Sequence, residues 1–76
     1  MNIYSWNVNG LRSALKKGFS DWFAATKPDI LCLQEVRAEV DQIPDEVAKP
    51  EGYFAYWNPC RRKKGYSGVG IYTQIE

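Results

Sequence analysis

One carboxylate stands out because it directly follows an apolar run. The stretch DILCLQE (29–35) reads as a buried strand, yet it ends on Gln34 and Glu35 with no turn residue to separate them. An amide, Asn7, closes an earlier strand-like stretch in the same way. Mg²⁺ takes oxygen ligands and is usually held by one or two carboxylates together with substrate phosphates and several waters. Glu35 with an amide neighbour suits that role.

Both residues also have a simpler explanation. Glu35 could be the first solvated residue after a buried strand, paired with Arg37. Asn7 could satisfy local backbone groups without any ligand, as asparagine often does at strand ends. On spacing alone the simpler explanation is the stronger one. The chain contains no histidine, so the commonest general base is absent from its sequence.

Cationic residues occur near both ends of the chain. Arg12 and Lys17 belong to a predicted helix whose first N–H groups point toward the end of the sheet that carries Asn7, where a phosphate would be favoured. The loop RRKKGYSG (61–68) combines four cations with glycines and Tyr66. That mixture is typical of a surface that follows a nucleic-acid backbone, and it is equally typical of a solvated hairpin tip.

The elements that must position these residues follow from the hydrophobic pattern. Residues 2–8 alternate as a strand does, and residues 11–27 carry apolar side chains on one helical face. Gly18 interrupts the helical pattern, Ser20 is the expected N-cap of a second helical segment, and Pro28 ends it. A helical crossover of this length predicts two parallel strands. The carboxyl ends of such strands are where ligands bind in open sheets, so Asn7 and Glu35 should be neighbours.

The second half of the chain predicts a different arrangement. Residues 44–48 favour a short helical turn, and the strands 53–58 and 67–73 favour an antiparallel hairpin. The fold class is therefore α/β (α+β), a β-α-β unit followed by a hairpin. The larger aromatic residues are expected in the core rather than on a binding surface: Trp6, Trp22, Phe23, Tyr56 and Trp57.

Length and composition set limits on the fold. The chain has 76 residues and a net charge of +1, which allows one domain with a small core and excludes a strongly basic tail. No signal peptide or membrane-spanning stretch occurs, so a soluble cytoplasmic protein is expected. Cys32 and Cys60 lack metal-site spacing, and a disulfide is not expected.

The chain stops at Glu76 directly after the last predicted strand. This predicts a truncated domain with one sheet face and at least one sheet edge open.

Three stretches resemble a known family. SWNVNGLR (5–12), PDILCLQE (28–35) and GYSGVGIYT (65–73) are similar to the first three signature blocks of the exonuclease III family of apurinic/apyrimidinic endonucleases, in the same order and at about the same spacing. This family lies within the endonuclease/exonuclease/phosphatase superfamily. The resemblance covers residues 1–76, which would be about the first third of a complete member. It implies the N-terminal part of a four-layer αββα sandwich that lacks the C-terminal two thirds.

The resemblance also implies roles for single residues. Glu35 would be the principal ligand of Mg²⁺, for which Mn²⁺ can substitute, and Asn7 would help to build the metal and active site. Asn9 would contact this site indirectly, and Gly65 and Gly68 would allow close approach of DNA. Contacts to DNA would come from four residues: Arg12, Lys17, Tyr66 and Ser67.

The activity implied is Mg²⁺-dependent cleavage of duplex DNA on the 5′ side of abasic sites, with 3′-exonuclease action. The later family blocks, including an Asp-x-Asn pair and a Ser-Asp-His block, are absent from residues 1–76, so the chain alone is expected to be inactive and poorly stable. One alternative is a non-catalytic remnant that binds nucleic acid or another chain segment through its basic loop. Another is a superfamily phosphodiesterase acting on a lipid headgroup, which the close match of SWNVNGLR and GYSGVG to the DNA-acting branch disfavours.

Overall fold

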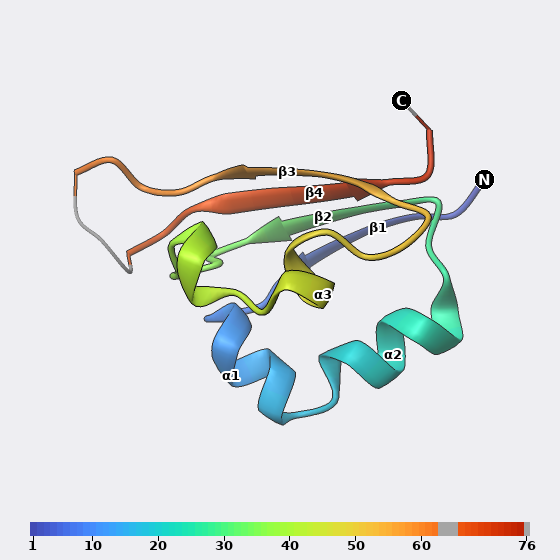
Figure 1. Cartoon of the computed structure of the whole chain (residues 1–76), viewed down its shortest axis with the longest axis horizontal. Helices are drawn as coiled ribbons and strands as arrows, with labels where there is room; N and C mark the ends of the chain where they lie inside the picture. Colours follow the sequence, from blue (N-terminus) through green and yellow to red (C-terminus); the bar gives the residue numbers. More distant parts are fainter. Residues whose placement is uncertain (63–65, 76) are drawn as a thin grey trace.

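The computed structural model of the chain describes residues 1–62 and 66–75. Four strands form one sheet, and the helices α1 and α2 lie along one face of it (Figure 1). The N-terminus and the end of β4 lie at one end of this sheet, and the end of β3 lies at the other (Figure 1). The elements in chain order are β1 (Ile3–Asn7), α1 (Leu11–Lys16), α2 (Phe19–Thr26), β2 (Ile30–Gln34), the 3₁₀ helix η1 (Val40–Gln42), α3 (Asp45–Ala48), β3 (Phe54–Asn58) and β4 (Val69–Thr73).

The first two strands are parallel, as the crossover predicts. Their register runs from Ile3 opposite Ile30 to Asn7 opposite Gln34. Because the two strands end at the same level, the residue that follows β2 lies beside the end of β1. This register brings Glu35 next to Asn7, which are 28 positions apart in the sequence.

The last two strands form the predicted antiparallel hairpin, and the sheet order is β1-β2-β4-β3. Strand β4 also pairs antiparallel with β2, with Val69 opposite Gln34. The start of β4 therefore lies at the same edge of the sheet as the ends of β1 and β2. Residues 67 and 68, which precede β4, reach the candidate site by this route.

The helical crossover is divided by Gly18, as expected. Gly18 is left-handed with φ 102°, and its carbonyl accepts the N–H of Trp22 at 3.0 Å. It is thus the N-cap of α2 itself, and the prediction that Ser20 caps this helix is wrong. Gly18 therefore both interrupts the helical crossover and begins α2, so Ser20 lies inside the first turn of that helix. Lys27 adopts a left-handed conformation that ends α2 just before Pro28.

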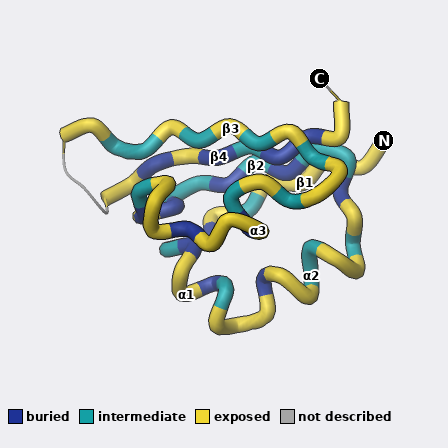
Figure 2. The backbone as a smooth tube through the Cα atoms, viewed as in Figure 1, coloured by how far each residue is buried: buried dark blue, intermediate teal, exposed yellow. Residues whose placement is uncertain are grey.

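The core lies between the sheet and the helices. Leu31 and Leu33 of β2 and Tyr72 of β4 are at most 1% exposed, and buried positions alternate along these strands (Figure 2). Four of the five aromatic residues predicted in the core pack against it, but Tyr56 is 53% exposed, so that prediction is wrong for this residue. Ala55 and Trp57 take the core side of β3, and strand alternation turns Tyr56 to the opposite face.

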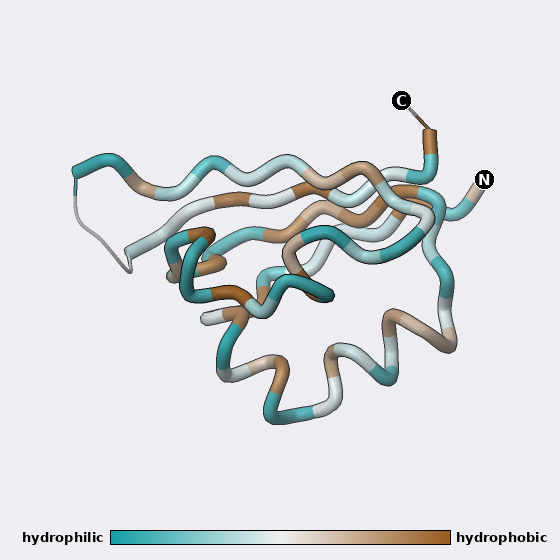
Figure 3. Tube along the Cα trace, viewed as in Figure 1, coloured by the Kyte–Doolittle hydropathy of each residue, from teal (hydrophilic) through white to brown (hydrophobic). Residues whose placement is uncertain are grey.

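The opposite face of the sheet carries apolar side chains that no described helix covers. Hydrophobic residues run along the inner strands β2 and β4 (Figure 3). Exposed apolar side chains with no described helix over them show that the predicted open face is present among the described residues. Its most exposed members are Ile3, Phe54, Tyr56 and Val69. No helix among the described residues is long and apolar enough to cross a membrane.

Gly70 is required by close packing in the sheet. It lies opposite Trp57, and a Cβ atom added at Gly70 would come within 2.5 Å of the indole ring. The indole N–H of Trp57 donates to the carbonyl of Ala48 at 2.9 Å, which fixes the ring in place.

Gly70→Ala is expected to lower the free energy of unfolding by about 1–3 kcal/mol, as overpacking does. Urea denaturation of the single variants and of the double variant with Trp57→Ala would measure this. Because the shorter side chain removes the clash, Gly70→Ala should cost little in the Trp57→Ala background. Equal costs in the two backgrounds would contradict this explanation.

Candidate metal centre and its cationic border

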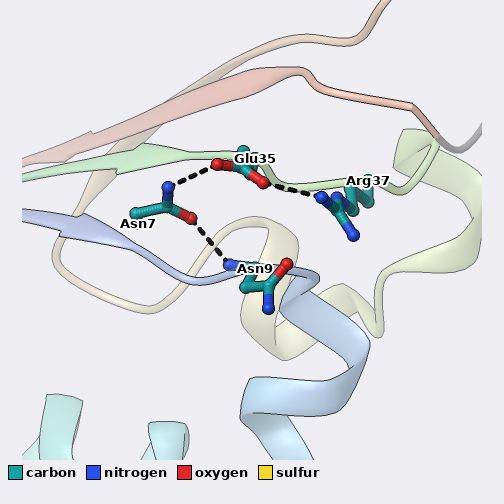
Figure 4. Close-up of polar contacts among 4 residues, drawn as sticks. All are labelled: Asn7, Asn9, Glu35 and Arg37. Atoms are coloured by element: carbon teal, nitrogen blue, oxygen red, sulfur yellow. Dashed lines mark hydrogen bonds and ion pairs between the residues drawn. The ribbon is translucent and has the colours of Figure 1, made fainter.

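Asn7 and Glu35 form the centre of the candidate site (Figure 4). The amide Nδ2 of Asn7 donates to Oε2 of Glu35 at 2.5 Å. The backbone N–H of Asn9 donates to Oδ1 of Asn7 at 3.0 Å, which fixes the orientation of the amide. Asn9 thus acts on the site through Asn7. The strand ends bring together two of the residues singled out from the sequence, and their side chains interact directly.

Arg37 binds the other oxygen of Glu35. Its Nη2 donates to Oε1 at 2.7 Å, and both side chains remain partly exposed, at 45% for Arg37 and 38% for Glu35 (Figure 4). The pairing that the simpler explanation of Glu35 required is therefore present. It coexists with the bond from Asn7, so both carboxylate oxygens of Glu35 are held in place.

The backbone of residues 35–37 is fixed by two neighbouring loops. The carbonyls of Glu35 and Val36 accept the N–H groups of Gly10 and Leu11, each at 2.8 Å. On the other side, the N–H of Val36 donates to the carbonyl of Gly68 at 3.0 Å, and the N–H of Arg37 donates to the carbonyl of Ser67 at 2.7 Å. The backbone of Glu35 is therefore held in place by hydrogen bonds to segments on both sides of it.

Left-handed backbone conformations concentrate at this edge of the sheet. Of the five non-glycine residues with positive φ among those described, four lie here: Asn9, Glu35, Arg37 and Ser67. Such a conformation costs a residue other than glycine or asparagine roughly 1–2 kcal/mol. Strain of this kind persists only where the surrounding structure imposes it, and it is concentrated at functional sites.

The surroundings of Glu35 favour its charged form. The hydrogen bond from Asn7, followed by the charge and hydrogen bond of Arg37, lowers the pKa of Glu35 below its ordinary value, and partial desolvation opposes this shift. The carboxylate is therefore ionised at neutral pH. Because its pKa is lowered by folding, Glu35 stabilises the fold fully above its ordinary pKa near 4.5, and this stabilisation is lost as the pH falls through the lower value.

Asn7→Ala is expected to raise the pKa of Glu35 toward its ordinary value, because it removes the largest cause of the shift. The carboxyl ¹³C chemical shift of Glu35, followed by NMR as a function of pH, would measure the change. Asn58→Ala is a matched control at the end of β3, and it should leave this titration unchanged. An unaltered pKa of Glu35 in the Asn7→Ala variant would contradict the assignment.

The oxygen atoms present fit a partial site for a hard cation. Among the described residues no group of three or more His, Cys, Asp or Glu side chains could enclose a metal ion. One carboxylate and one amide oxygen with an unused lone pair nevertheless suit Mg²⁺, which keeps several waters and is completed by substrate phosphates. Coordination by Glu35 and by Asn7 stays a prediction.

The two cationic residues predicted on the first helix, Arg12 and Lys17, lie at different distances from the site. Arg12 lies close to the site, because its Nη2 donates to the carbonyl of Arg37 at 3.3 Å. Lys17 is the C-cap residue at the far end of α1. A hollow of about 720 Å³ is instead lined by three cationic residues, Arg12, Lys16 and Arg37, and by uncharged residues that include Gln42 and Pro44. Lys16 was not singled out from the sequence, although its position one turn after Arg12 could have indicated it.

Two N–H groups at the start of α1 are used inside the fold. That of Leu11, and that of Gly10 just before the helix, donate to the carbonyls of Val36 and Glu35, so these two are not available to a phosphate. A six-residue helix also has only a small dipole. The phosphate site predicted at this helix end stays a prediction, and the cationic side chains nearby could attract an anion as well.

The segment before β4 forms a second border of the site. Tyr66 and Ser67 line a hollow of about 290 Å³ together with Glu35 and Arg37, and Tyr66 is 60% exposed. Gly68 has φ +91° and lies close to Pro59, a conformation that disfavours any other residue. Of the basic loop, Arg61 and Arg62 are exposed, whereas Lys63, Lys64 and Gly65 lie outside the described residues.

Comparison with known families agrees with this geometry. The model of the endonuclease/exonuclease/phosphatase family matches residues 4–76. The chain belongs to this family. Nucleases of the endonuclease/exonuclease/phosphatase family generally depend on a divalent metal ion, and the fold described here is the N-terminal portion of their sandwich.

Three curated relatives align with nearly the whole chain. The DNA repair nuclease APEX1 of Danio rerio is 43% identical over 77 residues, covering 100% of this chain and 25% of its own length. The exodeoxyribonuclease of Bacillus subtilis is 40% identical, covering 100% and 29%. The DNA-(apurinic or apyrimidinic site) endonuclease 2 of Schizosaccharomyces pombe is 35% identical, covering 97% and 16%. The chain thus spans less than a third of each of these relatives.

A solved structure extends the similarity to three dimensions. The 3′ phosphatase NExo from Neisseria, bound to a product DNA hairpin, superposes with a TM-score of 0.77 at 34% sequence identity. The superposition covers 97% of this chain and 27% of the other. The resemblance to the DNA-acting branch of the family is therefore confirmed in both sequence and fold.

Proposed function

We propose that the chain is the N-terminal part of a Mg²⁺-dependent DNA repair nuclease that cleaves duplex DNA on the 5′ side of abasic sites and has 3′-exonuclease action. The observation that carries this proposal is the ionised Glu35, held by Asn7 where two parallel strands end and bordered by cations. Its relatives are named as DNA repair nuclease, exodeoxyribonuclease and abasic-site endonuclease, which supports this substrate class.

Each residue of the site has a defined task in this proposal. Glu35 would hold Mg²⁺, with Mn²⁺ as a substitute, and Asn7 orients the Glu35 carboxylate and supplies a second oxygen. The bound ion would polarise the phosphoryl oxygens of the scissile phosphate. Arg12 and Lys16, with Lys17 farther along the helix, would contact neighbouring phosphates, while Tyr66 and Ser67 border the hollow beside Glu35.

The chain by itself is expected not to cleave DNA. Hydrolysis also needs a group that deprotonates or orients the attacking water. The sequence has no histidine, and both oxygens of Glu35 accept hydrogen bonds. Purified chain incubated with Mg²⁺ and a duplex that contains one abasic site should leave the duplex intact. Incision that depends on Mg²⁺ and is lost in Glu35→Ala would contradict this expectation.

A chimera tests the proposed function directly. Residues 1–76 would replace the aligned residues of the Bacillus subtilis exodeoxyribonuclease, of which they cover 29%. The chimera is expected to cleave abasic duplex and to remove 3′ nucleotides in the presence of Mg²⁺. A chimera that folds but has no activity on either substrate would overturn the proposed function.

A second candidate function is nucleic-acid binding without catalysis. The hollow bordered by Arg12, Lys16 and Arg37 and the exposed Arg61 and Arg62 favour attraction of a phosphate backbone. Binding of this kind would weaken steeply with salt and would show no preference for abasic sites. Equal affinity of the chain for intact and abasic duplexes, together with an inactive chimera, would favour this second function.

A further inference from the structure

Arg37 contacts Glu35 and also borders the neighbouring cationic hollow. Its Nη2 donates to Oε1 of Glu35 at 2.7 Å, and this oxygen is one of the two that a divalent cation could bind. Arg37 is also one of the residues that line the hollow bordered by Arg12 and Lys16, a lining that includes no carboxylate. Arg37 therefore joins an anionic partner, which its guanidinium binds, to a cationic surface, which its residue borders.

The backbone determines this intermediate position. Arg37 is left-handed with φ 54°, its N–H is bound by the carbonyl of Ser67, and its carbonyl accepts from Arg12. The backbone is thus held while the side chain, which is 45% exposed, can change its rotamer. Rotation of an exposed side chain takes picoseconds to nanoseconds.

The position of the Arg37 side chain is expected to depend on which ligands are bound, because its positive charge is attracted to anions and repelled by cations. While Glu35 has no other cation, Arg37 neutralises its charge. A divalent cation on Glu35 would repel the guanidinium, and a phosphate in the cationic hollow would attract it. An arginine fork matches phosphate oxygens well.

We propose that Arg37 is an exchangeable counter-ion that binds Glu35 in the absence of metal and turns to a DNA phosphate beside Arg12 and Lys16 once a divalent cation occupies Glu35. This inference rests on the proposed function, because it requires the cation to bind Glu35. It makes Arg37 a positioning residue that couples two ligands. By linkage, metal strengthens phosphate binding and phosphate strengthens metal binding by the same factor.

Two titrations of the 76-residue chain test the coupling. The first follows the binding of Mn²⁺ alone by the loss of the free Mn²⁺ signal in electron paramagnetic resonance. Arg37→Gln should bind Mn²⁺ about fivefold more tightly than the unaltered chain, the size expected for release from one exposed ion pair. The matched control Lys49→Gln, which removes the same charge from an exposed position at the end of α3, should change the affinity less than about twofold.

The second titration follows a short DNA duplex by fluorescence anisotropy, with and without Mg²⁺ at constant ionic strength. Mg²⁺ should strengthen duplex binding more in the unaltered chain and in Lys49→Gln than in Arg37→Gln. Arg37→Lys, which keeps the charge but not the fork, should fall between them. Circular dichroism of each variant would establish that it is folded.

Each outcome separates the inference from the function on which it rests. If Arg37→Gln binds Mn²⁺ no more tightly than the unaltered chain, or keeps the full effect of Mg²⁺ on duplex binding, the exchange is overturned while the metal site stands. If the unaltered chain binds no Mn²⁺, or Glu35→Gln binds it equally well, the metal site itself is wrong and the exchange fails with it.

Discussion

Replacing Glu35 with glutamine in the chimeric nuclease is expected to lower the rate of Mg²⁺-dependent incision by about 10²–10⁴-fold. Several kcal/mol of transition-state stabilisation come from a catalytic metal ion, and each 1.36 kcal/mol corresponds to a factor of about ten. Glutamine keeps the shape of Glu35 but removes the charge that would hold the cation. It also replaces one acceptor oxygen with an amide group that faces the donors of Asn7 and Arg37.

The measurement is single-turnover incision of an abasic duplex over a range of Mg²⁺ concentrations. The matched control is Glu51→Gln, which makes the same change of charge at an exposed loop position and should leave the rate within about twofold, as surface charges do. If Glu35→Gln retained more than a tenth of the rate, Glu35 would not be the principal metal ligand.

Tyr72→Ala is expected to remove a large share of the free energy of unfolding of the chain. Tyr72 is fully buried in β4, where four aromatic rings lie with their centroids within 6.4 Å of its ring: Phe19, Phe23, Tyr53 and Trp57. Replacing a large buried aromatic residue by alanine costs roughly 3–5 kcal/mol. The total free energy of unfolding of a chain of this length is only about 4–11 kcal/mol. Its circular dichroism and its urea midpoint would show the loss.

Tyr72→Phe separates packing from hydrogen bonding at the same position. The hydroxyl donates to the carbonyl of Val47 at 2.7 Å and thereby holds α3 to the sheet. Removal of the hydroxyl should lower the free energy of unfolding by about 1 kcal/mol and leave the chain folded. If Tyr72→Ala were as stable as Tyr72→Phe, the aromatic cluster would not be the core of this fold.

The same hydroxyl predicts how stability depends on alkaline pH. Burial raises the pKa of Tyr72 above its ordinary value near 10. Because folding raises this pKa, the stabilisation is complete below about pH 10 and is lost as the pH rises above it. Tyr72→Phe should therefore lose less stability than the unaltered chain when the pH is raised from 9 to 11 (approximate limits).

Hydrophobic periodicity was sufficient to predict the four strands and the helical crossover, but not the 3₁₀ helix η1. The crossover from β1 to β2 and the hairpin of β3 and β4 both follow from apolar patterns that local sequence carries. The meeting of Asn7 and Glu35 also follows, because parallel strands joined by a short crossover end at the same edge. The aligned register of β1 and β2 then determines which residues face each other.

The details of the site could not be predicted in the same way. Left-handed backbone at Glu35, Arg37 and Ser67 is imposed by hydrogen bonds between segments far apart in the sequence. No propensity of these residue types indicates it. The proposed exchange of Arg37 between Glu35 and a phosphate depends on this backbone conformation. The exposure of Tyr56 depends on which face of β3 meets the helices, and an alternating strand on its own does not reveal this.

We expect a divalent cation to bind at the ends of β1 and β2. The most direct test is the broadening of backbone amide signals by traces of Mn²⁺ in NMR spectra of the ¹⁵N-labelled chain. The signals of Asn7, Glu35 and Arg37 should broaden first, whereas those of Ile3 and Thr73 at the far end of the sheet should stay sharp, and Glu35→Gln should remove the effect. Broadening that is uniform, or that persists in Glu35→Gln, would contradict this expectation.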